Sequence, residues 1–400
     1  MINPKTNQRE LAYAVRITDV RDIEGVNNQV AVVNGWTVFV KRDEFKPGDL
    51  AIYFEIDSKV PEKPCFEFLR KYNFKVKTQK FVKGLVISQG LVIKPEELGL
   101  KNVEEGEFLT EKLGVVYYEA EDNKRKADNT KYTSMQARHK KFFKTKFGKW
   151  LMTREWGRKL CFFFLGKKKD KKSDWPTWVV KTDEERIQNM PHIYTQEVGS
   201  SWIATEKIDG SSTTFTMKQD KPKKRKLLVC SRNVVFDSPK KEDKNYYKEI
   251  CGNIWLEMAD KYDIAGVLND VLNRHPNWEF ITIQGETFGA GVQKRDYGMK
   301  DRDFRVFNII YKENGKAPVR MSTLDMSYFL ALHSGMKCLK TVPILTDNFI
   351  IPDSCEKIIA AAAGLSKLDG KSREGIVFRT RDGERSFKAV DPEFLMKYHN

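Results

Sequence analysis

A lysine ends a strand-like run at residues 201–207 (SWIATEK), and an Asp-Gly pair follows it closely. Lysine is rarely placed beside an acid at the end of an apolar run without a chemical reason. Its amine is a nucleophile only when deprotonated, so we expect burial or neighbouring positive charge to lower the pKa of Lys207. Lys388 or a carboxylate-bound divalent ion could supply that charge. Asp209 and Gly210 would form a tight turn that keeps the backbone close to whatever the amine attacks.

Five further segments with chemically useful residues follow Lys207. Each lies on an apolar, strand-like run or ends one. They are residues 229–233 (VCSRN), 281–289 (ITIQGETFG), 304–311 (FRVFNIIY), 373–379 (REGIVFR) and 386–390 (SFKAV). Together with KIDG at residues 207–210, they resemble the ordered motifs of the covalent nucleotidyltransferases. A KxDG pattern alone is weak, but six matches in one order are hard to obtain by chance.

The resemblance implies a role for each of these residues. Lys207 would become linked to a nucleoside monophosphate through a phosphoramidate, with Asp209 in the same motif, and Lys388 would grip the α-phosphate. Glu374 would be the metal carboxylate, and Glu286 would contact the ribose or a metal-bound water. The other implied nucleotide contacts are adenine stacking by Phe307, adenine-edge reading by Glu206, and ribose or phosphate contacts from Arg232 and Asn233. The implied cofactors are ATP and Mg²⁺ or Mn²⁺, the ions that suit hard oxygen ligands.

Several of these residues also have an ordinary structural explanation. Phe307 fits a core position, Glu374 a helix cap or loop acid, and Lys388 a charge on a strand edge. The fifth motif also departs from the family pattern, which often has two basic residues spaced K-x-K. Here Ser386 stands two residues before Lys388, and Arg385 is the nearest substitute for the second basic contact.

Residues 1–115 predict an all-β unit. Alternating or β-branched runs cover LAYAVRITDV, QVAVV and WTVFV, and the Asn34-Gly35 pair between the last two predicts a hairpin. LAIYFEI supplies another strand, and KFVKGLVISQGLVI supplies two more, separated by Ser88-Gln89-Gly90. Short strands at this spacing predict a small barrel, for which an oligonucleotide-binding (OB) fold is the leading candidate and an SH3-like barrel the alternative.

Residues 116–175 predict a basic helical connector. Residues 124–172 hold 18 Lys or Arg and three acids, a net charge of +15, against +16 for the whole chain. Concentrated positive charge with interleaved aromatics is typical of a protein that binds a phosphate backbone. The helical period predicts an apolar face that could instead pack on a neighbouring domain or lie on a membrane surface; it comprises Phe143, Phe147, Trp150 and Leu151. The predicted nucleic-acid contacts are Lys140, Lys141, Lys144, Lys146 and Lys149.

Residues 176–400 mix strands and helices, which predicts an α+β protein with ATP-grasp-like antiparallel sheets and helices in this third unit. Within it, residues 181–191 (KTDEERIQNMP) predict a short helix ended by Pro191. The basic run at residues 221–226 (KPKKRK) predicts a solvated hairpin tip.

The order of the units indicates which family of nucleotidyltransferases the chain resembles most. DNA ligases and mRNA-capping guanylyltransferases usually carry their OB module after the fifth motif, but only twelve residues follow Lys388. A barrel before the core instead resembles the amoeba-type ATP-dependent RNA ligases. That family implies sealing of RNA 3′-hydroxyl and 5′-phosphate ends, at a nick or a broken stem-loop, through lysyl-AMP and adenylylated RNA. A DNA ligase-like enzyme, a GTP-dependent capping enzyme and a catalytically inactive RNA-binding protein are the alternatives.

The sequence gives no sign of a membrane or a disulfide-rich protein. No apolar run approaches the roughly 20 residues of a membrane span, and the first residues lack an apolar signal-peptide core. The six cysteines form no CxxC pair and the five histidines show no ligand spacing, so no disulfide framework or zinc site is expected. We therefore expect a soluble intracellular monomer, cytoplasmic or nuclear.

Overall fold

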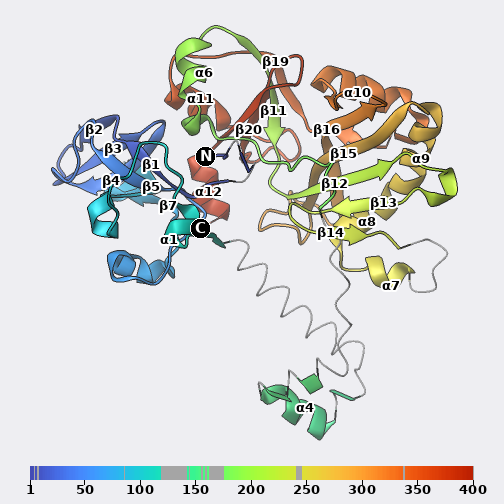
Figure 1. Ribbon diagram of the computed structural model, residues 1–400, viewed down its shortest axis with the longest axis horizontal. Helices are drawn as coiled ribbons and strands as arrows, with labels where there is room; N and C mark the ends of the chain where they lie inside the picture. Colours follow the sequence, from blue (N-terminus) through green and yellow to red (C-terminus); the bar gives the residue numbers. More distant parts are fainter. Residues whose placement is uncertain are drawn as a thin grey trace.

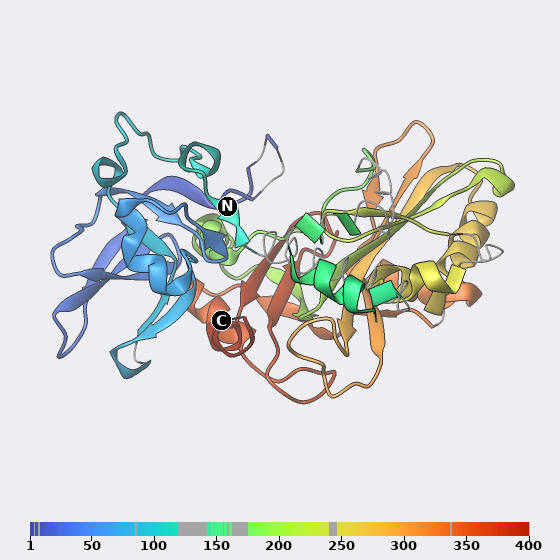
Figure 2. The same cartoon turned by 90° about the horizontal axis from the view of Figure 1, so that it is seen from below.

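The chain folds into a small β-rich unit and a larger unit with two sheets, which lie at opposite ends of Figure 1. The computed structural model describes residues 1–3, 5–6, 9–84, 86–118, 142–143, 145–154, 156–157, 160–161, 175–239, 246–336 and 338–399. Helix α12 (Pro392–Tyr398) lies between the two units, as both views show (Figures 1 and 2). The end of the chain therefore returns to the junction between the first unit and the second.

The small unit is a barrel-like set of short antiparallel strands around an apolar interior. Its strands are β1 (Ala12–Arg16), β2 (Asp19–Asp22), β3 (Asn28–Val33), β4 (Trp36–Lys41), β5 (Leu50–Phe54), β6 (Ser58–Lys59), β7 (Thr78–Phe81), β8 (Val86–Gln89), β9 (Leu91–Ile93) and β10 (Val116–Tyr117). They pair in the orders β1-β5-β9, β2-β3-β4, β7-β8 and β10-β6. The buried side chains form two clusters, one around Trp36 and one around Phe54. The expected all-β unit is confirmed.

One strand boundary differs from the prediction. Ser88 and Gln89 are not a linker but the last residues of β8, and only Gly90 separates β8 from β9. Gly90 has a φ of 103°, and a Cβ there would lie 2.4 Å from the Tyr53 ring. Glycine alone fits both constraints, so the chain can reverse within one residue.

The predicted Asn34-Gly35 hairpin turn is confirmed, and it also contacts the larger unit. Asn34 adopts the left-handed conformation with a φ of 52°. Gly35 N donates to Gln188 O at 3.1 Å, and a Cβ on Gly35 would lie 2.4 Å from the Cys355 sulfur. The turn therefore needs glycine because the second unit approaches it closely.

The larger unit contains two sheets. The four-stranded sheet has the order β19-β11-β20-β21 and consists of β11 (Ser201–Lys207), β19 (Ile344–Ile350), β20 (Gly375–Arg379) and β21 (Ser386–Val390). The seven-stranded sheet has the order β14-β13-β12-β15-β16-β17, with β18 parallel to β16; it consists of β12 (Ser211–Lys218), β13 (Leu227–Cys230), β14 (Val235–Asp237), β15 (Trp278–Gly289), β16 (Arg302–Glu313), β17 (Val319–Arg320) and β18 (Lys340–Thr341). The expected α+β class with largely antiparallel sheets is confirmed.

Helices cover both sheets and fill the connections. The α-helices are α1 (Thr110–Leu113), α4 (Lys146–Thr153), α6 (Pro191–Gln196), α7 (Tyr246–Ile250), α8 (Ile254–Lys261), α9 (Ile264–Arg274), α10 (Thr323–Leu332), α11 (Cys355–Ala362) and α12. The 3-10 helices are η1 (Pro64–Tyr72), η2 (Val82–Gly84), η3 (Pro95–Leu98), η4 (Ile187–Asn189), η5 (Pro222–Lys224) and η6 (Ser334–Met336). Helices α8, α9 and α10 lie along the larger sheet in Figure 1, and their apolar faces join its main core. Helix η5 lies between β12 and β13, where the basic hairpin tip is predicted.

The KIDG segment joins the two sheets. Lys207 ends β11 in the smaller sheet, and Ser211 begins β12 in the larger one. Gly210 is held tightly in this crossing, because a Cβ would lie 2.3 Å from Thr287 O and 2.8 Å from Glu286 Cγ. The motif therefore stands where side chains from both sheets converge.

The helix predicted over residues 181–191 is largely wrong: residues 181–186 are extended, and only the short 3-10 helix η4 forms, at Ile187–Asn189. Arg186 forms a parallel bridge with Lys388, and Lys388 N donates to Glu185 O at 2.8 Å. Pro191 begins helix α6 instead of ending a helix, which agrees with the preference of proline for a first helical turn. Pairing with the edge of β21 thus overrides the local helical pattern of these charged residues.

The described part of the connector contains α4. Thr145 caps this helix, and its hydroxyl accepts from Gly148 N at 3.0 Å. Leu151 is buried with Phe142 and Phe143, but Phe147 and Trp150 are exposed. The predicted common face is therefore only partly correct, because two of its aromatic rings remain in contact with solvent. None of the helices in the described part of the chain has the length and apolar content of a membrane span.

Asn189 links the two units through buried hydrogen bonds. Asn189 Oδ1 accepts from Trp36 Nε1 at 2.7 Å and from the Tyr13 hydroxyl at 3.1 Å. Its Nδ2 donates to Glu55 at 2.9 Å and to Glu185 at 2.8 Å. Trp36, Tyr13 and Glu55 are buried residues of the barrel, so a core residue satisfies three of their polar atoms. The two units also meet through apolar side chains, because Leu395 of α12 packs into the barrel cluster around Trp36.

We predict that Asn189→Ala lowers the free energy of unfolding by roughly 2–4 kcal/mol, because it leaves the buried Trp36 indole N–H without its partner and removes one hydrogen bond each from Tyr13 and Glu55. The measurement is chemical denaturation, with Asn314→Ala, which alters an exposed turn residue, as the matched control. Equal stability of the two variants would contradict this account of the junction.

Candidate active site

Lys207 and Glu374 meet because neighbouring strands place them side by side. The antiparallel register pairs Lys207 with Gly375, so Glu374 lies next to the end of β11. Lys207 Nζ lies 2.7 Å from each carboxylate oxygen of Glu374. The side chain of Lys207 is 25% exposed and that of Glu374 is 9% exposed. The amine is thus reachable from solvent, while its carboxylate partner is almost buried.

The surrounding acids keep the Lys207 amine charged. Burial alone would lower the pKa of Lys207, but the negative charges of Glu374, Glu286 and Asp209 raise it above its ordinary value. The expectation that the protein's own side chains lower this pKa is therefore wrong. The reason is that the negative charges of these three acids outweigh the effect of burial, so a change in the charge of the site is needed to deprotonate the amine.

Glu286 enters the site from the larger sheet. The register of β12 and β15 pairs it with Ser212, directly after the KIDG crossing. Burial raises the pKa of Glu286 to about 8, and the carboxylates of Glu374 and Asp209 add to this effect while Lys207 opposes it. The site therefore contains more acids than the single amine can neutralise.

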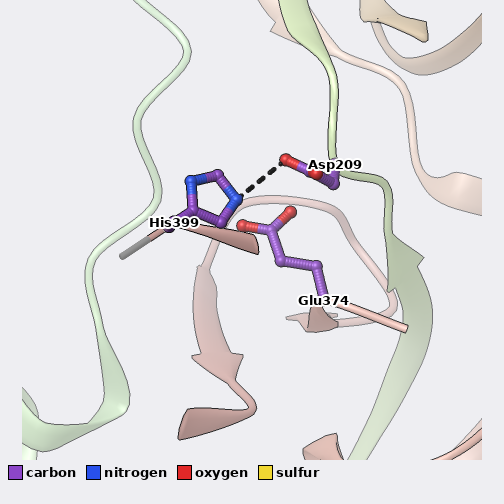
Figure 3. Close-up of side chains that lie close together, drawn as sticks. All are labelled: Asp209, Glu374 and His399. Carbon is purple, nitrogen blue, oxygen red and sulfur yellow. Dashed lines mark hydrogen bonds and ion pairs between the residues drawn. The ribbon is translucent and has the colours of Figure 1, made fainter. Parts of the chain in front are cut away.

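Asp209 and His399 form a second pair beside Glu374 (Figure 3). His399 Nε2 lies 3.1 Å from Asp209 Oδ1. Asp209 N donates to the Tyr297 hydroxyl at 2.7 Å, which fixes the turn. Burial lowers the pKa of His399, but Asp209 and Glu374 raise it further, so the net shift is upward. His399 carries no sequence signal of a site, because it follows helix α12 and has no neighbouring ligand residue.

The side chain of Glu206 lies on the face of the smaller sheet opposite to that of Lys207, because successive side chains alternate along a strand. Its buried carboxylate accepts hydrogen bonds from Ser366 Oγ and from Lys367 N, the latter at 2.8 Å. These bonds anchor the loop that precedes Glu374. An adenine contact from the Glu206 side chain stays a prediction, and it would have to compete with this anchoring role.

Lys388 and Arg232 are brought together by Asp183, a residue that lies outside the sequence motifs. Lys388 Nζ lies 2.8 Å from Asp183 Oδ1, and Arg232 lies 2.6 Å from Asp183 Oδ2. Burial would raise the pKa of Asp183, but these two cations hold it far below its ordinary value. Burial lowers the pKa of Lys388 despite Asp183. Asp183 was overlooked because its segment resembles a charged helix, whereas it runs beside β21.

Phe307 occupies an irregular position in β16. The pairing with β15 shifts between Gln284 and Gly285, which leaves Phe307 as the extra residue of a β-bulge. Bulges often re-aim a side chain near an active site. The half-buried ring packs on a small cluster that includes Ile208 and lies 6.0 Å from the Arg379 guanidinium. Adenine stacking stays a prediction for this ring.

The remaining nucleotide candidates lie nearer the surface. Asn233 is exposed in the turn between β13 and β14. Arg385, the substitute considered for the second basic contact, is paired with Glu197 at 2.6 Å. Ser386 bonds to Glu184 through its hydroxyl. Arg385 is therefore engaged away from Lys388, and the motif keeps one basic residue.

Most of the predicted nucleic-acid lysines cannot be placed. Lys140, Lys141 and Lys144 lie outside the described residues, as does the side chain of Lys146. Lys149 is exposed on α4. Beside it, the rings of Phe147 and Trp150 stack with centroids 5.9 Å apart, and Arg154 lies 4.7 Å from the Trp150 ring. The described part of the connector thus presents aromatic and cationic groups together.

Comparison with models of protein families shows which family the chain belongs to. A family model described as RNA ligase matches residues 200–399, half of the chain, and a model described as an OB-fold domain matches residues 11–95. The chain belongs to the RNA ligase family, and its N-terminal barrel is an OB fold rather than an SH3-like barrel. A search of the curated proteins gives no match.

Solved structures with a similar fold include several of the Naegleria gruberi RNA ligase. A lysine-to-methionine mutant with AMP and Mn is 25% identical, with a TM-score of 0.72 over 98% of this chain and 99% of that chain. The same ligase with PPi is 25% identical, with a TM-score of 0.71 over 98% and 99% of the two chains. A lysine-to-alanine mutant with ATP and Mn is also 25% identical, with a TM-score of 0.70 over the same shares. The similarity thus spans the barrel and the core together.

We predict that Glu286→Gln stabilises the metal-free protein at pH 8 but not at pH 4. The pKa of Glu286 is raised from 4.5 to about 8, so the folded protein keeps a proton that the unfolded chain loses. The stability linked to this group is fully present below pH 4.5 and is lost as the pH rises through about 8. The neutral amide removes that loss. Thermal unfolding in EDTA should show a gain of a few degrees at pH 8, at roughly 2–4 °C per kcal/mol.

Glu24→Gln, at an exposed turn residue, is the control for a change of charge alone. A Glu286→Gln protein with no gain at pH 8, or with an equal gain at pH 4, would contradict the raised pKa.

Proposed function

We propose that this protein is an ATP-dependent RNA ligase that joins a 3′-hydroxyl to a 5′-phosphate. The observation that carries the proposal is the position of Lys207, at the crossing of two sheets and against Glu374, in a chain of the RNA ligase family. Related structures hold ATP, AMP or PPi, which are the substrate and the two product fragments expected for transfer of AMP to a lysine. The finer assignment is a phosphodiester-forming enzyme with units at 1–115, 116–175 and 176–400, acting as a monomer.

The acidic residues fit a divalent cation. Asp209, Glu286 and Glu374 place buried carboxylates around one amine, and Asp209 Oδ2 is buried with no hydrogen-bond partner among the described residues. Carboxylate oxygens suit Mg²⁺ and Mn²⁺. Glu374 and Glu286 would hold such an ion, and its charge would offset the carboxylates that keep the pKa of Lys207 high.

In the first step, Lys207 attacks the α-phosphorus of ATP. A bond forms between the lysine nitrogen and the α-phosphorus. The bond between the α-phosphorus and the oxygen that bridges to the β-phosphate breaks, and pyrophosphate leaves. The ammonium must first lose its proton and separate from Glu374, so the ion pair both aims the amine and holds it inactive. The strand register fixes the direction of attack, since Lys207 extends from the end of β11.

The phosphates need positive charge opposite the amine. Lys388 and Arg232 are the proposed contacts, and Asp183 holds them near one another. Asp183 occupies both cations in the structure, so a phosphate would share them with this carboxylate or replace it. Fixed cations of this kind stabilise the charge that develops on phosphate oxygens during transfer. Phe307, Asn233 and Glu206 are the further proposed nucleotide contacts.

In the second and third steps, AMP passes to the RNA 5′-phosphate and the 3′-hydroxyl then displaces it. The N-terminal OB fold and the basic connector support an RNA partner, since both features recur in proteins that bind nucleic-acid backbones. The exposed rings of Phe147 and Trp150 add surfaces on which unpaired bases could stack, as Lys149 and Arg154 attract the backbone. A nick or a broken stem-loop would offer both backbone and unpaired bases.

We predict that the protein gains the mass of one adenylyl group after incubation with ATP and Mg²⁺ or Mn²⁺. Intact mass spectrometry followed by peptide mapping should place the adduct on Lys207. Lys207→Ala should abolish the adduct and the sealing of a 3′-hydroxyl/5′-phosphate nick, because the nucleophile is gone. Lys367→Ala, on the loop between α11 and β20, is a control lysine that should keep the adduct, because the Lys367 amine donates to Ile344 O and not to a site residue.

Three other outcomes would contradict the proposal in distinct ways. A guanylyl adduct with GTP alone would indicate a capping enzyme. Sealing of DNA nicks but not of RNA nicks would indicate a DNA ligase-like enzyme. Absence of any adduct from folded protein would indicate an RNA-binding protein without catalysis.

We further predict that RNA affinity falls steeply with salt and that the connector carries much of this slope. Each phosphate contact by a cation contributes roughly 0.7–0.9 to the slope of log K against log salt. Replacing Lys140, Lys141, Lys144 and Lys146 by serine should flatten the slope by about 3, measured by fluorescence anisotropy. Replacing Lys221, Lys223, Lys224 and Lys226 in the hairpin tip removes the same charge and is the control. An unchanged slope in the connector variant would assign these lysines to a role other than RNA binding.

A further inference from the structure

His399 brings an imidazole to the carboxylates of the site. One ligand atom each from Asp209, Glu374 and His399 lie within 4.8 Å of one another, and the three side chains converge in Figure 3. They come from three separate elements: the KIDG crossing, the residue before β20, and the residue after α12. A set of this kind is assembled only by the tertiary fold.

Asp209 supplies an independent sign that a cation belongs here. Its side chain is among the most buried acids of the described chain, with the residue 3% exposed. Oδ1 is bonded to His399 Nε2, but Oδ2 has no hydrogen-bond partner among the described residues. A buried carboxylate oxygen without a partner carries a substantial free-energy cost, which a bound ion would remove.

The position of His399 is also fixed by packing that does not depend on the site. Asp391 caps α12 by accepting from Glu393 N at 2.9 Å, and Pro392 occupies the first turn. Phe394 and Leu395 are buried on its inner face. The helix contacts the barrel through Lys80, which pairs with Glu393 at 2.6 Å. The imidazole therefore reaches the site only when the barrel, α12 and the core are packed together.

We propose that Asp209, Glu374 and His399 form a divalent-cation site in which the imidazole nitrogen is a direct ligand. This rests on the proposed function, whose carboxylate metal site it deepens. Mg²⁺ prefers an all-oxygen environment, whereas an imidazole nitrogen suits first-row transition ions, of which Mn²⁺ is the weakest binder. The His399 ligand therefore makes the site selective for Mn²⁺ over Mg²⁺. His399 Nε2 would leave Asp209 Oδ1 for the ion, and both atoms would then face the same cation.

The test is pulsed electron paramagnetic resonance of Mn²⁺ bound to the full-length protein without nucleotide. Protein labelled with ¹⁵N-histidine should show a ¹⁵N coupling to the ion, which assigns the nitrogen to an imidazole rather than to the Lys207 amine. His399→Ala and His399→Gln should both lose this coupling. The glutamine variant can still hydrogen-bond to Asp209, so it separates loss of a ligand from loss of that bond. His192→Ala, which removes an exposed histidine, should keep the coupling.

The same variants should change metal preference. Mn²⁺ affinity should weaken at least about tenfold in both His399 variants, the size of effect that even a supporting residue of a metal site produces. Mg²⁺ affinity, measured by competition with Mn²⁺, should change much less.

Two results would overturn the proposal: Mn²⁺ bound without a histidine coupling in the unaltered protein, or a coupling that survives in His399→Ala. Failure of Mn²⁺ to bind at all would overturn it as well. If the unaltered protein still forms lysyl-AMP in that case, the proposed function stands and only the imidazole ligand is refuted.

Discussion

The site depends on the ion pair between Lys207 and Glu374, because this pair lies among more acids than it can neutralise. The paired amine keeps its proton, and Glu286 retains its own proton up to a pKa of about 8. Both effects have one cause, which is negative charge held away from water. These charges favour the protonated Lys207 amine, which cannot act as a nucleophile, and they also attract cations. The proposed activation of Lys207 and the proposed binding of a metal ion would therefore both follow from the same electrostatic imbalance.

The fold creates this imbalance by letting separate elements meet. Lys207 and Glu374 come from neighbouring strands of one sheet, and Glu286 comes from a strand of the other. The extended segment that contains Asp183 runs beside β21 and ties two cations to the edge of the site. The same segment continues to Asn189, which binds the barrel. Docking of the barrel and alignment of Lys388 and Arg232, the proposed phosphate contacts, thus depend on one stretch of chain.

Much of the fold and part of the site can be predicted from the sequence. The features that could be predicted depend on residues close together in the sequence or on the motifs, and the others depend on contacts between distant residues. Local signals located the Asn34-Gly35 hairpin, the barrel strands and the strand that carries Lys388. The motif order indicated the convergence of Lys207 with Glu374. Asp183 and His399 could not be found in this way, since a parallel bridge and a helix at the far end of the chain bring them in. The expected direction of the pKa shift of Lys207 was wrong for the same reason, since it depends on acids that the tertiary fold brings to the amine.

The most direct test of this account is the pKa of the Lys207 amine itself. Lysine labelled with ¹³C at Cε can be titrated by nuclear magnetic resonance in the full-length protein, with Lys207→Arg to assign the signal. The account predicts an apparent pKa above the free-lysine value of about 10.4 in EDTA, and a lower apparent pKa once Mg²⁺ is saturating. A Lys207 amine that is already neutral at pH 9 in EDTA, or a pKa that does not respond to Mg²⁺, would contradict it.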